Sequence, residues 1–176
     1  PVVTYTMTEY RYSEQYNVHD YSNHFFEMID SLGVNTAVNY VNTVKYPKSK
    51  FDSFLNSRGY VGNDYLNDIV GTQYLRNMRY GEALKYLGNV SVAYKRHHNV
   101  YMEFDPFCFD IKSIGLESDF RYDFAKEMHS LEKNINATID PNRKAKLMLK
   151  FAIGIKNSFD RCWGLTQYYR GTTYWG

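Results

Sequence analysis

The chain has 176 residues, of which 44% are hydrophobic and 18% aromatic, so it has enough apolar material for a folded core, and disorder is excluded. Its 21 Lys and Arg residues nearly balance 19 Asp and Glu, and the net charge of +2 excludes a strong nucleic-acid-binding surface. No stretch reaches the roughly 18 consecutive apolar residues that a transmembrane segment needs, which excludes a membrane span in this chain.

Residues 21–58 are predicted to form a helical hairpin. Its first helix ends at Gly33, a favourable C-cap, and its second begins with Asn35 as N-cap and ends at Pro47. A short further helix closes at Gly59. The apolar residues that carry the helical period are Phe25, Ile29, Leu32, Ala37, Tyr40, Val41, Val44, Phe51, Phe54 and Leu55.

Residues 63–89 predict a second hairpin, with Asn63 as its N-cap and a short turn at residues 76–79. Gly71 and Ala83 are small residues placed where two helix backbones would approach closely. Larger side chains are expected to fill the space around that contact, namely Tyr74, Tyr80 and Leu87.

The spacing in residues 67–87 resembles the tetratricopeptide (TPR) helical hairpin, whose pattern runs W-x2-L-G-x2-Y, then A-x3-F, then P. Two positions depart from it, since Asn67 stands where Trp is usual and Lys95 where Pro is usual. The resemblance implies an interaction scaffold with no chemistry of its own.

Residues 90–116 show no persistent helical period and predict a long aromatic-rich loop around Asp105-Pro106-Phe107. Proline disfavours helix at the residue before it, so Asp105 is expected to cap a turn. Phe107 and Phe109 are expected to anchor this loop to the helices.

Residues 118–160 predict two further helices, the second with Asp140 as N-cap and Pro141 at its first position. The apolar stripe of the first is Phe124, Met128, Leu131 and Ile135, and that of the second is Ala145, Met148, Leu149, Ala152, Ile155 and Phe159. A faint second TPR-like spacing runs through Phe151-Ala152 and Ile155 to Gly164 and Tyr168. No strand alternation occurs, so we expect one all-α domain over residues 1–176, with antiparallel hairpins stacked in a TPR-like arrangement.

No catalytic, cofactor-binding or metal-binding site is predicted. The histidines show neither H-x3-H nor H-E-x-x-H spacing, and adjacent His97 and His98 would point about 100° apart on a helix. The carboxylates Glu103, Asp105 and Asp110 are weighed as a glycosidase pair, but a turn-capping role for Asp105 is preferred. Cys108 and Cys162 define no disulfide framework, and whether they pair stays open. Nucleophile-elbow and phosphate-loop motifs are absent.

A second resemblance covers residues 60–176. It rests on ordered short motifs: Val100-Tyr101, Asp105-Pro106-Phe107, Phe124-Ala125-x2-Met128, Asp140-Pro141-Asn142-Arg143, Ala152-x-Gly154-x-Lys156-Asn157-Ser158, and Cys162-Trp163-x-Leu165-Thr166-x-Tyr168-Tyr169. Together they resemble a segment of large uncharacterised cell-envelope proteins of Bacteroides and relatives. The resemblance implies a cell-envelope location, periplasmic or outer-membrane-associated, and a piece of a longer, exported, lipid-anchored protein. The start at Pro1 and the end at Gly176 favour the same expectation.

Two functions follow as hypotheses. The first is a non-catalytic interaction or scaffold module that presents a groove to a protein or peptide partner, because a TPR-like hairpin occurs and no catalytic constellation does. The alternative is a glycan-binding module, or part of a polysaccharide-handling enzyme, because the chain has 18 Tyr and 11 Phe. Most of the tyrosines are expected to fill the core between helices.

Overall fold

The computed structural model describes residues 31–58, 63–97, 105–108 and 120–167. Every regular element in these ranges is helical, so the all-α class is confirmed for them. The elements are α3 (Val34–Lys45), α4 (Lys50–Arg58), α5 (Asn63–Arg76), α6 (Tyr80–Leu87), α7 (Val92–His97), α8 (Phe120–Ala137), α9 (Pro141–Phe159) and the 3-10 helix η1 (Trp163–Leu165). The predictions for residues 21–30 and for Gly59 lie outside the described residues.

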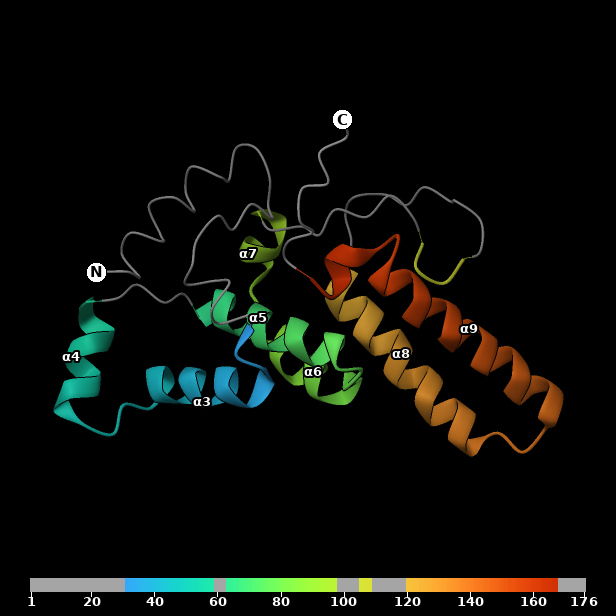
Figure 1. Ribbon diagram of the computed structural model, residues 1–176, viewed down its shortest axis with the longest axis horizontal. Coiled ribbons are helices and arrows are strands. Elements are labelled where there is room, and N and C mark those ends of the chain that lie inside the picture. The colour runs from blue at the N-terminus through green and yellow to red at the C-terminus, as the bar shows by residue number, and fades with distance from the viewer. Residues whose placement is uncertain (1–30, 59–62, 98–104, 109–119, 168–176) are drawn as a thin grey trace.

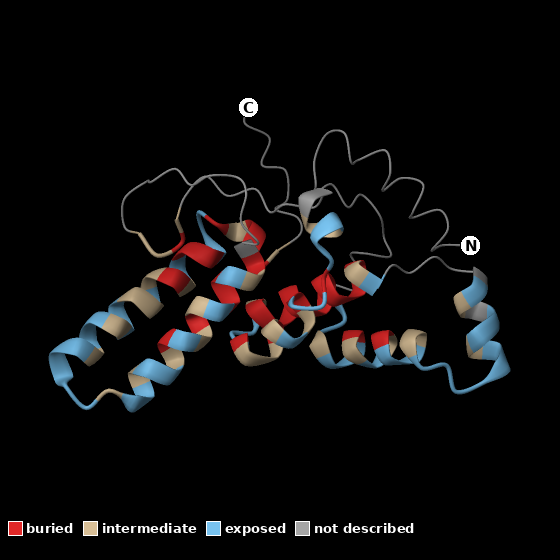
Figure 2. Cartoon of the chain, turned by 180° about the vertical axis from the view of Figure 1, so that it is seen from behind, coloured by how far each residue is buried: buried red, intermediate tan, exposed pale blue. Residues whose placement is uncertain are grey.

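The described α-helices other than α7 follow one another in a row, and α7 lies above α5 in the view of Figure 1. Helix α3 packs against α4 on one side and α5 on the other, α5 packs against α6, α6 against α8, and α8 against α9. Figure 2 shows the buried residues gathered on α5 in the middle of the row and on the facing sides of its neighbours. The row therefore has two end helices, α4 and α9, each with one side left uncovered by the row.

The α5–α6 pair contains the close helix approach that the sequence predicted. A Cβ atom added to Gly71 would lie 2.5 Å from Cγ of Leu87, so only glycine fits there beside α6. Ala83 is fully buried, and so are its neighbours on the same face of α6, Tyr80 and Leu87. Gly71 thus meets Leu87 across the pair.

Helix α5 ends in a Schellman motif, which makes the turn into α6. The backbone N–H of Arg79 donates to Tyr74 O at 2.9 Å, and that of Met78 donates to Leu75 O at 2.9 Å. Met78 has φ 56°, a left-handed conformation that glycine usually supplies. The short turn predicted for residues 76–79 is confirmed, with Arg76 still inside the helix.

Helices α8 and α9 form the long pair at one end of the row (Figure 1). Phe124, Met128 and Leu131 of α8 are buried, as their spacing predicted. The α9 N-terminus is also as predicted, since the Asp140 carboxylate accepts the Arg143 backbone N–H at 2.6 Å and Pro141 is the first helical residue.

Several predicted boundaries are wrong. Helix α3 begins at Val34, and its N-cap is Gly33 with φ 76° instead of Asn35, because this positive φ suits only glycine. The start of the next helix, predicted near residue 118, lies outside the described residues, and α8 is described from Phe120. Gly164, expected in a second TPR-like helix, lies in the 3-10 turn η1.

The predicted loop over residues 90–116 contains a short helix, α7. Ser91 precedes it and its hydroxyl accepts the Tyr94 backbone N–H at 3.2 Å, which is the geometry of an N-cap. The Ser91 hydroxyl also donates to Asp64 at 2.6 Å. The Asp64 side chain of α5 therefore fixes the start of α7. The sequence of α7 has no periodic pattern that would have predicted this helix.

The largest correction concerns α9. Of the apolar stripe predicted along this helix, only Ile155 packs against the core. The other members are exposed: Ala145, Met148, Leu149, Ala152 and Phe159.

Candidate functional site

Helix α9 is apolar on two adjacent sides, whose centres lie about 100° apart around the helix axis at 100° per residue. Its inner face packs on α8 through Leu147, Phe151 and Ile155, with the ring of Phe151 edge-on to Tyr80 at 5.9 Å. Gly154 brings the two helices close, because an added Cβ would lie 2.7 Å from Sδ of Met128. The inner face is thus set by one glycine and three half-buried apolar side chains.

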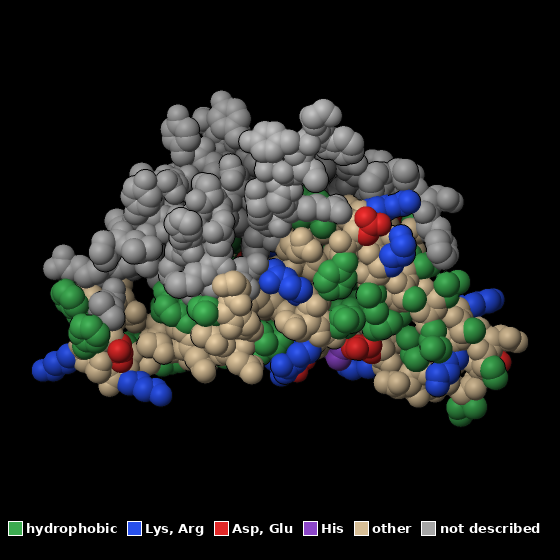
Figure 3. Space-filling view, viewed as in Figure 1, with side chains coloured by type: hydrophobic (Ala, Val, Ile, Leu, Met, Phe, Trp, Pro, Cys, Tyr) green, Lys and Arg blue, Asp and Glu red, His purple; other side chains and the backbone are tan. Residues whose placement is uncertain are grey.

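The outer face is the set Ala145, Met148, Leu149, Ala152 and Phe159. Met148 is 52% exposed and Leu149 is 53% exposed, and Ile139, in the turn before α9, is 95% exposed. Figure 3 shows hydrophobic side chains mixed with Lys and Arg over the α8–α9 end of the molecule. Single exposed apolar residues are common on proteins, whereas an ordered row of them along one helix face marks an interaction site.

At 100° per residue, Lys144 and Lys146 flank the outer face and Lys156 lies within it, whereas Arg143 lies on the far side of the helix. The charged side chains of α9 are Arg143, Lys144, Lys146, Lys150 and Lys156, and the helix contains no Asp or Glu. Lys150 pairs with Glu127 of α8 at 2.6 Å, and Lys156 pairs with Asp160 at 3.5 Å. The N-terminal half of the helix carries the other three, at the end where the helix macrodipole is already positive.

A buried ion pair holds the C-terminal turn against the middle of the row. Nη1 of Arg121 in α8 donates to both carboxylate oxygens of Asp68 in α5, at 2.8 and 2.9 Å. The Arg121 Nε and Nη2 donate to Gly164 O at 3.1 and 2.9 Å. Because both charged groups are almost fully buried and their hydrogen bonds are satisfied, the pair joins α5, α8 and η1.

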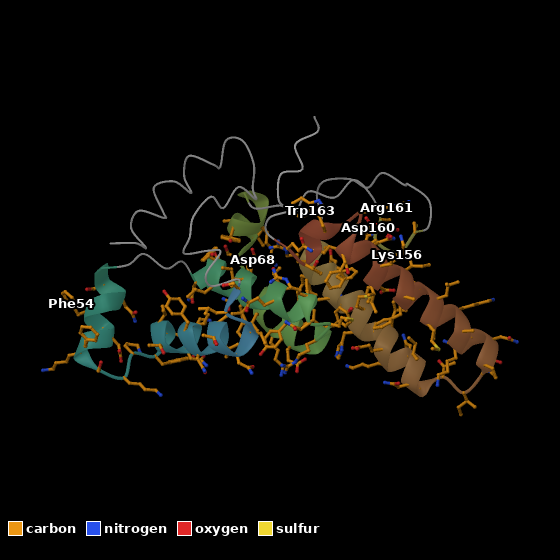
Figure 4. The ribbon with its side chains drawn as sticks, in the orientation of Figure 1. Phe54, Asp68, Lys156, Asp160, Arg161 and Trp163 are labelled. Atoms are coloured by element: carbon orange, nitrogen blue, oxygen red, sulfur yellow. The ribbon has the colours of Figure 1, made fainter. Side chains whose placement is uncertain are left out.

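Further hydrogen bonds fix η1 to its surroundings. Arg76 Nε donates to Thr166 O at 2.9 Å, and the Thr166 hydroxyl donates to Ser158 O at 2.8 Å. Figure 4 shows Asp68 in the middle of the row, with Lys156, Asp160, Arg161 and Trp163 around the end of α9. Sequence reasoning did not single out Asp68 or Arg121, which stand 53 positions apart and carry no local pattern.

Asp105 caps the turn at residues 105–108, as predicted. Its carboxylate accepts the Phe107 backbone N–H at 2.9 Å and the Cys108 thiol at 3.3 Å. Phe107 anchors the turn by stacking on Phe124 at 5.5 Å, and Asn157 donates to Pro106 O and Cys108 O, each at 3.0 Å. The other two carboxylates of the weighed glycosidase set, and Phe109, lie outside the described residues.

Cys108 and Cys162 are not joined by a disulfide. Cys162 is fully buried, and burial raises the pKa of its thiol to about 11. A protonated, inaccessible thiol is a poor nucleophile at neutral pH. Cys108 is half-buried and its thiol is directed to Asp105.

Among the described residues, no group of three or more His, Cys, Asp or Glu side chains is arranged to bind a metal ion. His129 lies between α8 and α6, beside Gly81, and its Nδ1 is 3.6 Å from Glu132. The helices in the described ranges are all too short or too polar to cross a bilayer.

The outer face of α9 is therefore the best-defined candidate site. Its residues were recognised in the sequence as an apolar stripe by their spacing, and the structure leaves them exposed. Comparisons of the chain with protein-family models, with curated proteins and with solved structures find no match.

Proposed function

We propose that the chain is a non-catalytic, TPR-like interaction module that binds a protein partner through the outer face of α9. The observation that carries this proposal is the second apolar face of one helix. An ordered apolar side of a helix that no other described element covers suits a partner, and among the described residues only the inner side of α9 is packed.

The α5–α6 pair supports the TPR-like part of the proposal. It has the small-residue approach at Gly71, the buried Ala83 and the short connecting turn. In solenoids of this kind each helical unit packs on its neighbours, and the final unit leaves a face free for binding or capping. The row from α3 to α9 follows the same logic of nearest-neighbour packing.

The non-catalytic part rests on the state of the reactive side chains. Asp105 is occupied as a turn cap, and the raised pKa of Cys162 disfavours its thiolate. The resemblance to Bacteroides-type envelope proteins supports a cell-envelope location for the module.

Glycan binding remains the alternative because of one observation at the other end of the row. Aromatic rings of the α3–α4 corner are exposed, with Tyr46 at 70%, Phe51 at 66% and Phe54 at 52%. Figure 4 places Phe54 on α4, far along the row from α9. Exposed rings suit stacking on sugars, and a glycan array comparing the native chain with Phe51→Ala and Phe54→Ala tests that function separately.

The test of the leading proposal is a selection of helix-forming peptides, displayed on phage, against the full chain. Enriched peptides should lose affinity by about tenfold or more for Leu149→Lys and Ala152→Arg, since both changes place a charge within the outer face. The control is Ser130→Arg, which adds the same charge at an exposed position of α8. Peptides that bind the native chain and the outer-face variants equally would reject this site.

The variants should remain folded, because the substituted side chains are exposed and Lys and Arg are good helix formers. Thermal melts should differ from the native melt by no more than about 3 °C.

A further inference from the structure

We infer that the partner of the outer face is an acidic amphipathic helix. This inference rests on the proposed function and names the class of partner. It combines the shape of the outer face with the distribution of charge around it.

The shape fits a helix. Ala145 and Ala152 are seven residues apart and therefore lie about 20° apart around α9, along the middle of the outer face. Met148 and Leu149 stand on either side of this line, about 100° from each other. The two alanines lie lower than the larger side chains beside them, which suits the side-chain ridge of another helix, and this strip ends at Lys156.

The length fits as well. From Ala145 to Phe159 the outer face extends over 14 residue steps, which at 1.5 Å per residue is roughly 21 Å. A partner helix of about 15 residues would cover it. That is an ordinary helix length in proteins.

The charge selects an acidic partner. Lys156 lies within the outer face, and Lys144 and Lys146 lie on either side of the face in the N-terminal half of α9. Cations at this end are unfavourable for the helix alone, because they add to the positive end of its dipole. A partner with carboxylates beside these cations would offset that cost and gain complementary pairing.

Two other occupants fit less well. A lipid surface favours helices whose inserted face is built of large apolar side chains, whereas alanines occupy the centre of the outer face. A second copy of this chain would bring two sets of the same cations together, which is repulsive.

The probe is a synthetic peptide of about 18 residues, with Leu and Ala at the a and d positions of its heptads and Glu at the flanking e and g positions. Two matched peptides carry Gln or Lys in place of Glu. Binding to the full chain is measured by fluorescence anisotropy in about 50 mM and about 500 mM salt.

The Glu peptide should bind at least about tenfold more tightly than the Gln peptide at the lower salt, and the Lys peptide should not bind. The preference should shrink at the higher salt because exposed charges are screened. The double variant Lys144→Glu, Lys146→Glu should lose the preference. The control Lys126→Glu, Lys133→Glu changes two exposed lysines of α8 and should keep it.

Equal binding of the Glu and Gln peptides, in a manner sensitive to Leu149→Lys, would overturn the acidic partner and leave the proposed function standing. If none of the three helical peptides binds, and peptides that bind at the outer face come only from a second library of peptides without helix propensity, the helical partner alone is overturned. Binding to vesicles of phosphatidylglycerol and phosphatidylcholine that Leu149→Lys abolishes would replace the helix with a membrane. If neither helical nor display peptides bind, the proposed function fails together with the inference.

Discussion

Met78 ends α5 in a left-handed conformation without the residue that best tolerates it. Its φ is 56° and its side chain is 47% exposed, so little packing compensates the strain. Met78→Gly should raise the free energy of unfolding by about 0.5–1 kcal/mol, because glycine adopts this conformation without a Cβ clash. Chemical denaturation measures the change.

The matched control is Met78→Ala, which removes the same side chain and keeps the Cβ atom. It should give no gain. Equal stabilisation by alanine and glycine would mean that the methionine side chain, and not the backbone conformation, is the source of the strain.

Arg121 illustrates a different residue-scale effect. Arg121→Met would leave the Asp68 carboxylate buried without its charge partner and remove both hydrogen bonds to Gly164 O. We expect a loss of about 3–5 kcal/mol in the free energy of unfolding, measured by urea denaturation.

Lys156→Met is the control, since the Lys156–Asp160 pair is exposed and 3.5 Å long, and it should cost no more than about 0.5 kcal/mol. Equal small losses in the two variants would show that the buried pair does not hold α5, α8 and η1 together.

The sequence predicts some of these residues and not others for a physical reason. Asp140 acts on the backbone three residues ahead, so its role as N-cap is visible in the local pattern. Asp68 and Arg121 meet only after α5, α6 and α8 have packed, and neither has a local signal. Local chemistry is thus predictable from the sequence, whereas the long-range ion pair is not.

At the scale of the element, the α5–α6 pair makes the strongest packing prediction. Ala83 is fully buried in the pair, whereas Lys85 on the same helix is exposed. Ala83→Leu should cost about 1–3 kcal/mol through overpacking, although leucine is nearly as good a helix former as alanine. Lys85→Leu should change the free energy of unfolding by no more than about 0.5 kcal/mol.

Paired thermal melts compare the two variants. Similar small changes in melting temperature for both variants would show that Ala83 does not lie in a close helix–helix contact. The TPR-like pair would then lose its main support.

Helix α9 shows why a periodic stripe can be assigned to the wrong side. Two adjacent sides of the helix are apolar, and the stripe found in the sequence is exposed except at Ile155. The packed side combines the apolar Leu147, Phe151 and Ile155 with Gly154, which lets Met128 and Phe107 come close. Asn157 on the same helix donates to the turn at residues 105–108. These close contacts carry no periodic signal, so the stripe alone did not identify the packed side.

At the scale of the whole molecule, the helices form a row in which each covers the next. The core of that row and the all-α class follow from helical spacing. The position of α9 at the end of the row follows only from the packing. This position leaves most of the predicted apolar stripe exposed, and the exposed part is the candidate binding surface. An acidic helix seated there would extend the row by one layer.

The most direct test of this account is a methyl NMR titration of the full chain, labelled at Ala and Met methyl groups, with the Glu peptide. The account predicts that the methyl signals of Ala145, Met148 and Ala152 shift in a saturable manner. The signals of Ala83 and Met128, which are fully buried between helices, should stay in place. Saturable shifts confined to residues away from the outer face, or no shifts at all, would contradict the claim that this face of α9 binds a partner.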